Sequence, residues 1–284
     1  MLRKFNPIEL ASSDKKSRVY FRHIRWKGKR RCPRCGHRLF HYLYDDRFGC
    51  KRCRYKFGEF TGTYLGEFNF SLDVLVHLIY LFALGVPAYR IRWYISVCLA
   101  TIERTFRVLR QSIYDESLQK LKELKLSGEI EIDEALFGGH RKGKRGWGAE
   151  GKTLVFGIYQ RNGNVITFPV LDRKHDTLVP LITQHTKRGS LYYSDDRTAY
   201  AALNLIGKHQ VVAHVSEGYV RDNSHINGIE GFWSYAKTWL YHYRGVPKQY
   251  FQLYLKEIKF RFNRRQGNVF GAFANIVAKT VANV

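Results

Sequence analysis

The chain has 284 residues, of which 45% are hydrophobic, enough for one good-sized core with smaller modules beside it. Lys and Arg number 48 against 24 Asp and Glu, so the formal net charge is +24. An excess of that size favours a polyanionic partner over a generically soluble surface, because neutralised phosphates release condensed counterions. An anionic membrane surface fits less well, since no basic amphipathic helix stands out.

The first residues do not resemble a secretory signal, because MLRKFNPIELASSDKK is polar after its second residue. The longest apolar run, residues 74–88, is interrupted by His77 and Pro87 and is too short to span a bilayer. We therefore expect a cytoplasmic, nucleoid-associated protein without a membrane segment, in which five cysteines stay reduced.

Two C-x-x-C pairs, CPRC and CKRC, lie near the N-terminus. Their four cysteines are Cys32, Cys35, Cys50 and Cys53. Two such pairs complete a closed tetrahedral zinc site, with HRLFHYLYDDRFG between them as a β-hairpin. Redox activity of a single pair is the alternative, but two pairs set among Lys and Arg favour structural zinc. His37 could substitute as a ligand, whereas Cys98 lies in an apolar stretch and is expected to be a packed core thiol.

Residues 71–113 are expected to form three helices. SLDVLVHLIYLFALG has Ser71 as N-cap and Gly85 as its stop, and PAYRIRWYIS begins with a proline suited to a first turn. TIERTFRVLRQSIY repeats apolar residues at three- and four-residue spacing. These residues are Ile102, Phe106, Leu109 and Ile113. YDESLQKLKELKLSG then indicates a charged helical linker.

The third of these helices is basic. Arg104, Arg107 and Arg110 occupy a face other than the apolar one. Three short helices with a basic last one fit a helix-turn-helix DNA reader. A plain helical bundle fits about as well, because arginines on a helix are often only solvated.

From about residue 128 the pattern changes to strands. EIEIDEALF, KTLVFGIYQ and NVITFPVL are strand-like, and RNGN signals a hairpin turn between the last two. A helix over 176–187, the strand SLYYSD, the helix TAYAALNLI, the strand HQVVAHV and long helices from about His225 follow. This order predicts an RNase H-like α/β domain. The chain is thus an α+β multidomain protein, with a zinc ribbon over 1–62, helix-turn-helix-like helices over 63–125 and a catalytic domain over 126–284.

Three carboxylates fall where that architecture places a metal site. Asp133 lies on the first strand, Asp195 ends the fourth, and Glu230 lies on a late helix in HINGIEGFWSYAK. Seven residues separate Glu230 from Lys237, nearly two helical turns, so both share one face. Taken singly, each has an ordinary alternative: a strand-end Asp caps a turn, the adjacent Asp196 could be the ligand, and Glu230 could be a surface acid. Together they favour two-metal phosphodiester chemistry.

Several motifs carry a family resemblance. RWKGKRRCPRCG, CKRC and FTGTYLGE are similar to a known zinc ribbon and its exit, and EIDEALFGGHRKGKRGWGAEGKTLVFGIYQRNG to a first strand, basic loop and hairpin. SDDRTAY, HINGIEGFWSYAK and FRFNRR are similar to two catalytic motifs and a C-terminal signature. In this combination, nearly the whole chain resembles the bacterial insertion-sequence DDE transposases with an N-terminal zinc ribbon, the ISXO2-like group.

The resemblance implies metal-dependent cleavage at the ends of a mobile element and strand transfer into target DNA. By motif, Asp133 and Asp195 are the first two carboxylates. The family varies between Asn and Glu at the third position, and Asn227 and Glu230 both occur here on one helical face. The spacing to Lys237 favours Glu230, with Asn227 as a ligand or a supporting partner.

The hypothesis gives each remaining residue a role. The carboxylates would hold Mg²⁺ or Mn²⁺. Lys237 would hold a phosphate near the cut, and His225 would orient the strand or act behind the ligands. The glycine-rich loop over 138–148 would contact phosphates and stack on bases, or be merely solvated. Its candidate residues are Arg141, Lys142, Lys144, Arg145 and Trp147.

Double-stranded DNA is the expected partner, as terminal inverted repeats and as target. Joining two DNA ends suggests a homodimer or a larger assembly. Two other classes compete: a transposase-derived DNA-binding regulator, which needs no acidic triad, and an RNase H-like nuclease, which needs no ribbon or reader. A tyrosine or single-strand transposase is disfavoured because no H-x-H metal motif is present.

Overall fold

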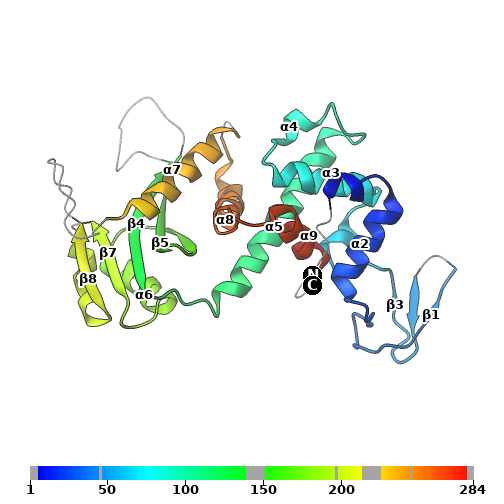
Figure 1. The fold of residues 1–284 in the computed structure, drawn as a ribbon, viewed down its shortest axis with the longest axis horizontal. Coiled ribbons are helices and arrows are strands. Elements are labelled where there is room, and N and C mark those ends of the chain that lie inside the picture. Colours follow the sequence, from blue (N-terminus) through cyan, green and yellow to red (C-terminus); the bar gives the residue numbers. More distant parts are fainter. Residues whose placement is uncertain are drawn as a thin grey trace. The chain divides into compact units, whose positions relative to one another are not determined.

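The computed structural model describes residues 6–44, 47–138, 151–195, 198–212, 225–243 and 245–279. The chain divides into two compact units: unit 1 holds residues 1–113 and 266–284, and unit 2 holds residues 114–265 (Figure 1). Among the described helices, none combines the length and the apolar character that a membrane span requires.

Unit 1 contains the helices that precede and follow the ribbon and one helix from the C-terminal end. They are α1 (Pro7–Leu10), α2 (Asp14–Trp26), η1 (Tyr64–Glu67), α3 (Leu72–Ala83), α4 (Ala88–Ile91), the first part of α5 (Leu99–Leu121) and α9 (Val269–Ala278). The predicted α3 is confirmed, with Ser71 at the N-cap position and Gly85, at φ +78°, just past the end. The capping bond itself comes from Asp14, whose Oδ1 accepts from the Leu72 amide at 2.7 Å.

Aromatic side chains from four helices make the core of unit 1. The Phe82 ring of α3 lies 4.9 Å from Phe106 of α5 and 5.0 Å from Phe273 of α9. Tyr20 of α2 stacks on Phe270 of α9, with centroids 6.3 Å apart. We expected residues 266–279 to lie with the catalytic domain; α9 instead packs against α2 and α3. The reason is its almost wholly apolar sequence, VFGAFANIVA, which needs a deep apolar surface to cover it.

The other two expected helices differ from their predicted lengths. α4 ends after one turn at Ile91, which is buried, whereas the next three residues, Arg92 to Tyr94, are exposed. α5 begins at Leu99 and continues into the expected linker as far as Leu121. Its four predicted core residues are all buried. Cys98, expected to be a packed core thiol, is exposed in the turn before α5.

The zinc-ribbon segment folds into a small antiparallel sheet. Its strands are β1 (Phe40–Tyr42), β2 (Phe48–Cys50) and β3 (Lys56–Phe57), in that order across the sheet. Phe40, Phe48 and Phe57 pack together, with the Phe48 and Phe57 rings 5.5 Å apart. The hairpin expected between the two cysteine pairs is confirmed.

Unit 2 is a five-stranded mixed sheet with helices on both faces (Figure 1). Its elements are β4 (Glu129–Phe137), β5 (Thr153–Gln160), β6 (Val165–Val170), α6 (His175–His185), β7 (Leu191–Asp195), η2 (Thr198–Leu205), β8 (Lys208–Val212), α7 (Asn227–Tyr241), η3 (Lys248–Tyr250) and α8 (Phe251–Phe262). The strand order is β6-β5-β4-β7-β8. The strands β4, β5 and β6 are antiparallel neighbours, whereas β7 and β8 run parallel to β4.

Alternation along the strands divides the core of unit 2 into two layers. Odd-numbered residues of β4 and β5, such as Ala135 and Val155, pack with α7 and α8. Even-numbered residues, such as Ile132 and Phe156, pack with α6 and η2 on the other face. Because side chains alternate along a strand, each odd residue of β4 faces α7.

The FRFNRR segment at the end of α8 attaches that helix to the sheet. The Asn263 side chain accepts from the amide and donates to the carbonyl of Val165 on edge strand β6, both at 2.9 Å. Arg261 and Glu257 form a buried ion pair at 2.7 Å one helical turn apart. These contacts give the motif a structural role.

Two buried lysines of α8 should make the stability of unit 2 increase with pH in the alkaline range. Burial lowers the pKa of Lys256 to about 8 and that of Lys259 to about 7, and both ammonium groups donate to buried oxygens. In the unfolded chain these lysines keep their protons to about pH 10.5. Between about pH 8 and 10.5 the unfolded state therefore binds more protons, and stability should rise with pH.

We expect that rise to reach up to about 1.4 kcal/mol per lysine for each pH unit. Denaturant unfolding from pH 7 to 9.5 measures it. A Lys256→Met/Lys259→Met variant should show a flatter dependence, whereas Lys187→Met, at an exposed position, should follow the wild type. Equal slopes for all three proteins would contradict the assignment.

Candidate functional site

Asp133 and Asp195 lie on neighbouring parallel strands and face the same side of the sheet. β4 and β7 are in register at Glu131 and Tyr193, and each aspartate comes two residues later in its strand. Adjacent strands lie about 4.8 Å apart, so the two carboxylates are close neighbours on the face that α7 covers. Both are half-buried. Glu134, one residue on, faces the other layer, where its carboxylate accepts from the Tyr200 hydroxyl at 2.5 Å.

Trp233 of α7 connects the helix to the first aspartate. Its indole Nε1 donates to Asp133 Oδ2 at 3.0 Å. Gly157, the β5 partner of Asp133 in the ladder, makes room for the indole: a Cβ there would lie 2.6 Å from the Trp233 ring. The glycine in KTLVFGIYQ therefore lets α7 approach the sheet beside the carboxylate.

The pKa of Asp133 is raised to about 6. Burial is the main cause, and the negative charges of Glu134 and Asp195 add to it, while hydrogen bonds from a backbone amide and from Trp233 act in the opposite sense. A half-buried carboxylate whose pKa is raised by burial and by neighbouring negative charges is a position that favours a bound cation.

A buried carboxylate that the motif reading did not single out holds the start of α7. Glu131 is 1% exposed, and its Oε2 accepts from the Ile229 amide at 2.8 Å. Its Oε1 pairs with Arg161 Nε at 2.8 Å. Arg161 also donates to the His225 carbonyl at 2.6 Å and lies 3.8 Å from the centre of the Tyr193 ring. Glu131 lies on the same face as Asp133, two residues earlier, and that spacing is the signal that could have identified it.

The remaining predicted catalytic residues lie along α7. Asn227, Glu230 and Lys237 are exposed, and Glu230 precedes Trp233 by three residues, on the same side of the helix. His225 precedes the helix, with its Nδ1 3.7 Å from Glu131 Oε1. Within the described ranges, the three predicted carboxylates do not form a cluster with ligand atoms within 4.8 Å of one another.

Several predicted residues lie outside the described part of the chain. Asp196, the alternative to Asp195, is one of them. The others are the loop residues Arg141, Lys142, Lys144, Arg145 and Trp147.

The four cysteines of the ribbon do converge. The sulfur atoms of Cys32, Cys35, Cys50 and Cys53 all lie within 4.8 Å of one another. The Cys32–Cys53 and Cys35–Cys50 pairs are 3.7 and 3.6 Å apart. Tetrahedral zinc with sulfur at about 2.3 Å needs sulfur separations close to these. Donor type and geometry thus both fit a closed zinc site.

The predicted basic face of α5 is only partly at the surface. Arg104 and Arg107 are exposed, but Arg110 is 5% exposed, with its guanidinium over the Phe82 and Phe106 rings. Each step of three residues turns back by about 60° on a helix, so Arg110 lies about 120° from Arg104 and reaches the apolar face. Arg110 is therefore a core residue and presents no charge to DNA.

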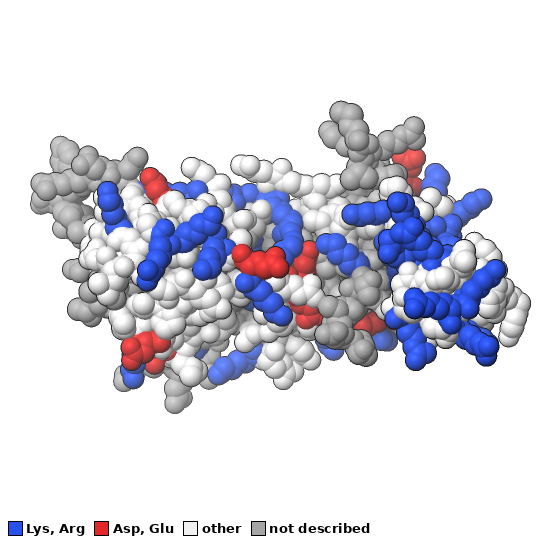
Figure 2. Space-filling model, turned by 90° about the horizontal axis from the view of Figure 1, so that it is seen from below, with Lys and Arg blue, Asp and Glu red and all other residues white. Residues whose placement is uncertain are grey.

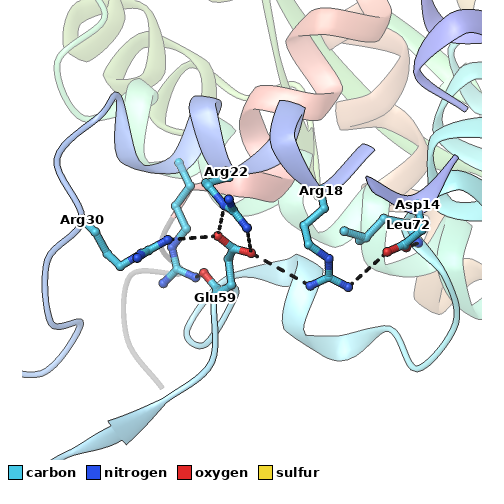
Figure 3. Close-up of polar contacts among 7 residues, drawn as sticks. Asp14, Arg18, Arg22, Arg30, Glu59 and Leu72 are labelled. Carbon is cyan, nitrogen blue, oxygen red and sulfur yellow. Dashed lines mark hydrogen bonds and ion pairs between the residues drawn. The ribbon is translucent and has the colours of Figure 1, made fainter. Parts of the chain in front are cut away.

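A second basic cluster, which the sequence did not predict, surrounds Glu59, two residues after β3 (Figure 3). The Glu59 side chain is 8% exposed and pairs with Arg22, with Arg30 at 3.4 Å and with Arg18 at 3.9 Å. Arg25 donates to the Glu59 and Thr61 carbonyls. Arg18 and Arg22 remain about half exposed, at 46% and 45%, so the cluster keeps a positive excess at the surface. Figure 2 shows Lys and Arg gathered over this end of unit 1.

Comparison with known proteins identifies a family for each part of the chain. Residues 125–263 match the ISXO2-like transposase domain, and residues 12–56 match the transposase zinc-ribbon domain. A transposase-like protein of Haemophilus influenzae is 34% identical over 102 residues, which are 36% of this chain and 83% of that protein. A protein in the transposable element ISH50 of Halobacterium salinarum is 24% identical over 282 residues, 90% of this chain and 92% of that protein.

Zinc should leave the ribbon when one buried ligand is removed. We expect the wild type to carry one zinc ion per chain and Cys50→Ala to lose it, because three thiolates no longer close the site. Hydrogen exchange over residues 40–57 should then speed up, since metal binding and folding are coupled in such modules. Cys98→Ala, which removes the exposed cysteine, is the matched control and should keep its zinc. Undiminished zinc in Cys50→Ala would rule out the tetrathiolate site.

Breaking the Glu131–Arg161 pair should destabilise unit 2. Arg161→Met leaves the Glu131 carboxylate buried without its cation and should cost about 3–5 kcal/mol in denaturant unfolding. Arg188→Met, at an exposed position, should change little. Adding Glu131→Gln should recover much of the loss, because the amide oxygen still accepts from Ile229. A cost below about 1 kcal/mol for Arg161→Met would show that α7 is held by other contacts.

Proposed function

Since this chain belongs to the ISXO2-like transposases of insertion sequences, we propose that it binds the ends of its element, cleaves DNA strands there and joins them to target DNA. The observation that carries the proposal is the pair Asp133 and Asp195, side by side beneath α7. We also propose that unit 2 is an RNase H-like catalytic domain. The central position of β4 and the strand order β6-β5-β4-β7-β8 support that assignment.

The acidic residues suit a divalent cation in their chemistry. Asp133 and Asp195 offer hard oxygen ligands, and the pKa of Asp133 is raised first by burial and then by neighbouring negative charge, both of which a bound cation would offset. When bound, Mg²⁺ or Mn²⁺ would supply activation of the attacking oxygen and stabilise charge on the leaving oxygen. Trp233 fixes the orientation of the Asp133 carboxylate, and its ring helps to exclude water from that side.

We propose Glu230 as the third carboxylate. It is exposed on the first turn of α7, three residues before Trp233, so its side chain lies on the side of the helix where Trp233 meets Asp133. Asn227 lies nearly one turn before Glu230, about 60° from it around the helix, and would support it. Lys237 would hold a DNA phosphate, and His225, beside the Glu131–Arg161 pair, would help to orient the strand.

We further propose that unit 1 recognises DNA. Its helices α3 to α5 would serve as a helix-turn-helix-like reader, with the exposed Arg104 and Arg107 facing phosphates. Arg18 and Arg22 would add phosphate contacts beside the ribbon. The basic loop over 138–148, most of which lies outside the described residues, would do the same. Holding two element ends at once calls for at least two copies of the chain on DNA.

Asp133→Asn should abolish metal-dependent strand cleavage of a DNA that carries the element's own ends. Loss of a carboxylate that binds the catalytic cation should cost at least about 10³-fold in rate. Affinity for the same DNA should stay within about twofold, because phosphate contacts lie elsewhere. Asp176→Asn, at a side chain that is 98% exposed on α6, is the matched control and should cleave like the wild type.

The outcomes separate the competing functions. Cleavage that survives Asp133→Asn would refute the acidic site. Tight binding by the wild type without any cleavage would favour a DNA-binding regulator. Cleavage without strand transfer would favour a nuclease. Glu230→Gln and Asn227→Ala in the same assay identify the third metal ligand. The ligand is the residue whose substitution lowers the cleavage rate more, with part of the rate restored at a higher metal concentration.

A further inference from the structure

The short helix α4 and the turn after it expose an unusual set of side chains. Tyr89, Trp93 and Tyr94 are 43%, 75% and 84% exposed. Arg90 and Arg92 lie between Tyr89 and Trp93 in the sequence and are exposed as well. Large aromatic groups in such numbers on one turn indicate a binding surface, because water contact with them is unfavourable.

This surface is held in place by the fold. Ile91, in its centre, is 1% exposed and anchors the turn in unit 1. The Tyr94 amide donates to the Ile91 carbonyl at 2.9 Å, so the residues between them form a closed turn. The Arg92 guanidinium lies 4.3 Å from the centre of the Trp93 ring. The backbone of the turn and the Trp93 ring are therefore held by local contacts, which lowers the conformational entropy that binding would cost.

The aromatic side chains border a shallow groove of about 720 Å³. Leu81, Val86 and Ile91 contribute apolar lining, and Arg90 and Arg92 contribute charge. Of the described residues that line the groove, none is acidic. Flat apolar rings next to two guanidinium groups match a ligand that combines planar faces with negative charge, as unpaired nucleotides do.

Two alternative partners fit less well. Paired bases of a duplex hide their faces in the stack, so a duplex would use the arginines and leave the rings in water. A second copy of this chain meeting through the same surface would bring Arg90 and Arg92 against their own counterparts, in a chain of net charge +24.

We propose that the α4 surface, comprising Tyr89, Arg90, Arg92, Trp93 and Tyr94, binds unpaired DNA bases by stacking, with the arginines on the adjoining phosphates. Strand ends fray most readily, so a nicked or cut end is the DNA feature that fits it. The proposal concerns binding alone and stands whether or not the acidic site cleaves DNA.

The test compares binding of a short labelled single strand with that of the matching duplex, by fluorescence anisotropy without added Mg²⁺ or Mn²⁺. The double variant Trp93→Ala/Tyr94→Ala should bind the single strand at least about tenfold more weakly and the duplex within about twofold of wild type. Trp93→Phe, which keeps a ring, should retain most of the affinity. Leu84→Ala removes a large exposed side chain without a ring, at 60% exposure, and should change nothing.

Charge is tested separately from stacking. Arg92→Gln should lower the salt dependence of single-strand binding, with a change of slope of about 0.7 on logarithmic axes. If the double variant lost affinity for the single strand and for the duplex equally, the surface would contact phosphates only, and the proposal would be overturned. Unchanged binding, or a change in oligomeric state by sedimentation without a change in binding, would overturn it too.

Discussion

The seating of α7 on the sheet depends on one buried carboxylate. Glu131 accepts a hydrogen bond from an amide at the start of the helix, and Arg161 neutralises its charge. A buried carboxylate would be unfavourable without such a partner, but paired in this way it holds the helix in place. Trp233 and Gly157 make the second attachment, directly beside Asp133. Every proposed role of Glu230, Asn227 and Lys237 presupposes this seating. A helix that carries catalytic groups needs such support, because small displacements of a reacting group are expensive.

Much of unit 2 could be predicted from its sequence. Because side chains alternate along a strand, EIEIDEALF indicates which residues face which layer, and it puts Asp133 and Glu134 on opposite faces, as the structure has them. The role of Glu131 could not be predicted, because its partners Arg161 and Ile229 are 30 and 98 residues away. Local pattern predicts the face of a residue, whereas its partner depends on tertiary packing.

In unit 1 the metal site could be predicted more fully than the helices. The cysteine spacing was sufficient to predict the convergence of four sulfur atoms, since each pair of ligands is local. The helices were predicted in kind but not in length, because only burial shows that α4 stops after one turn and that Arg110 belongs to the core. The Glu59 cluster could not be predicted for the same reason as the role of Glu131, because its partners are distant in the sequence: Arg22 and Glu59 are 37 residues apart.

The aromatic core of unit 1 includes rings from α9, near the end of the chain. During synthesis, therefore, the residues of unit 2 are complete before those of unit 1, although the N-terminal helices leave the ribosome first. Until residues 266–279 emerge, Tyr20 and Phe82 lack part of their cover. A nascent or prematurely ended chain would thus expose apolar surface and be a ready target for chaperones and proteases. The fold in this way couples assembly of the unit proposed to bind DNA to the synthesis of residues 266–279, which follow all of unit 2.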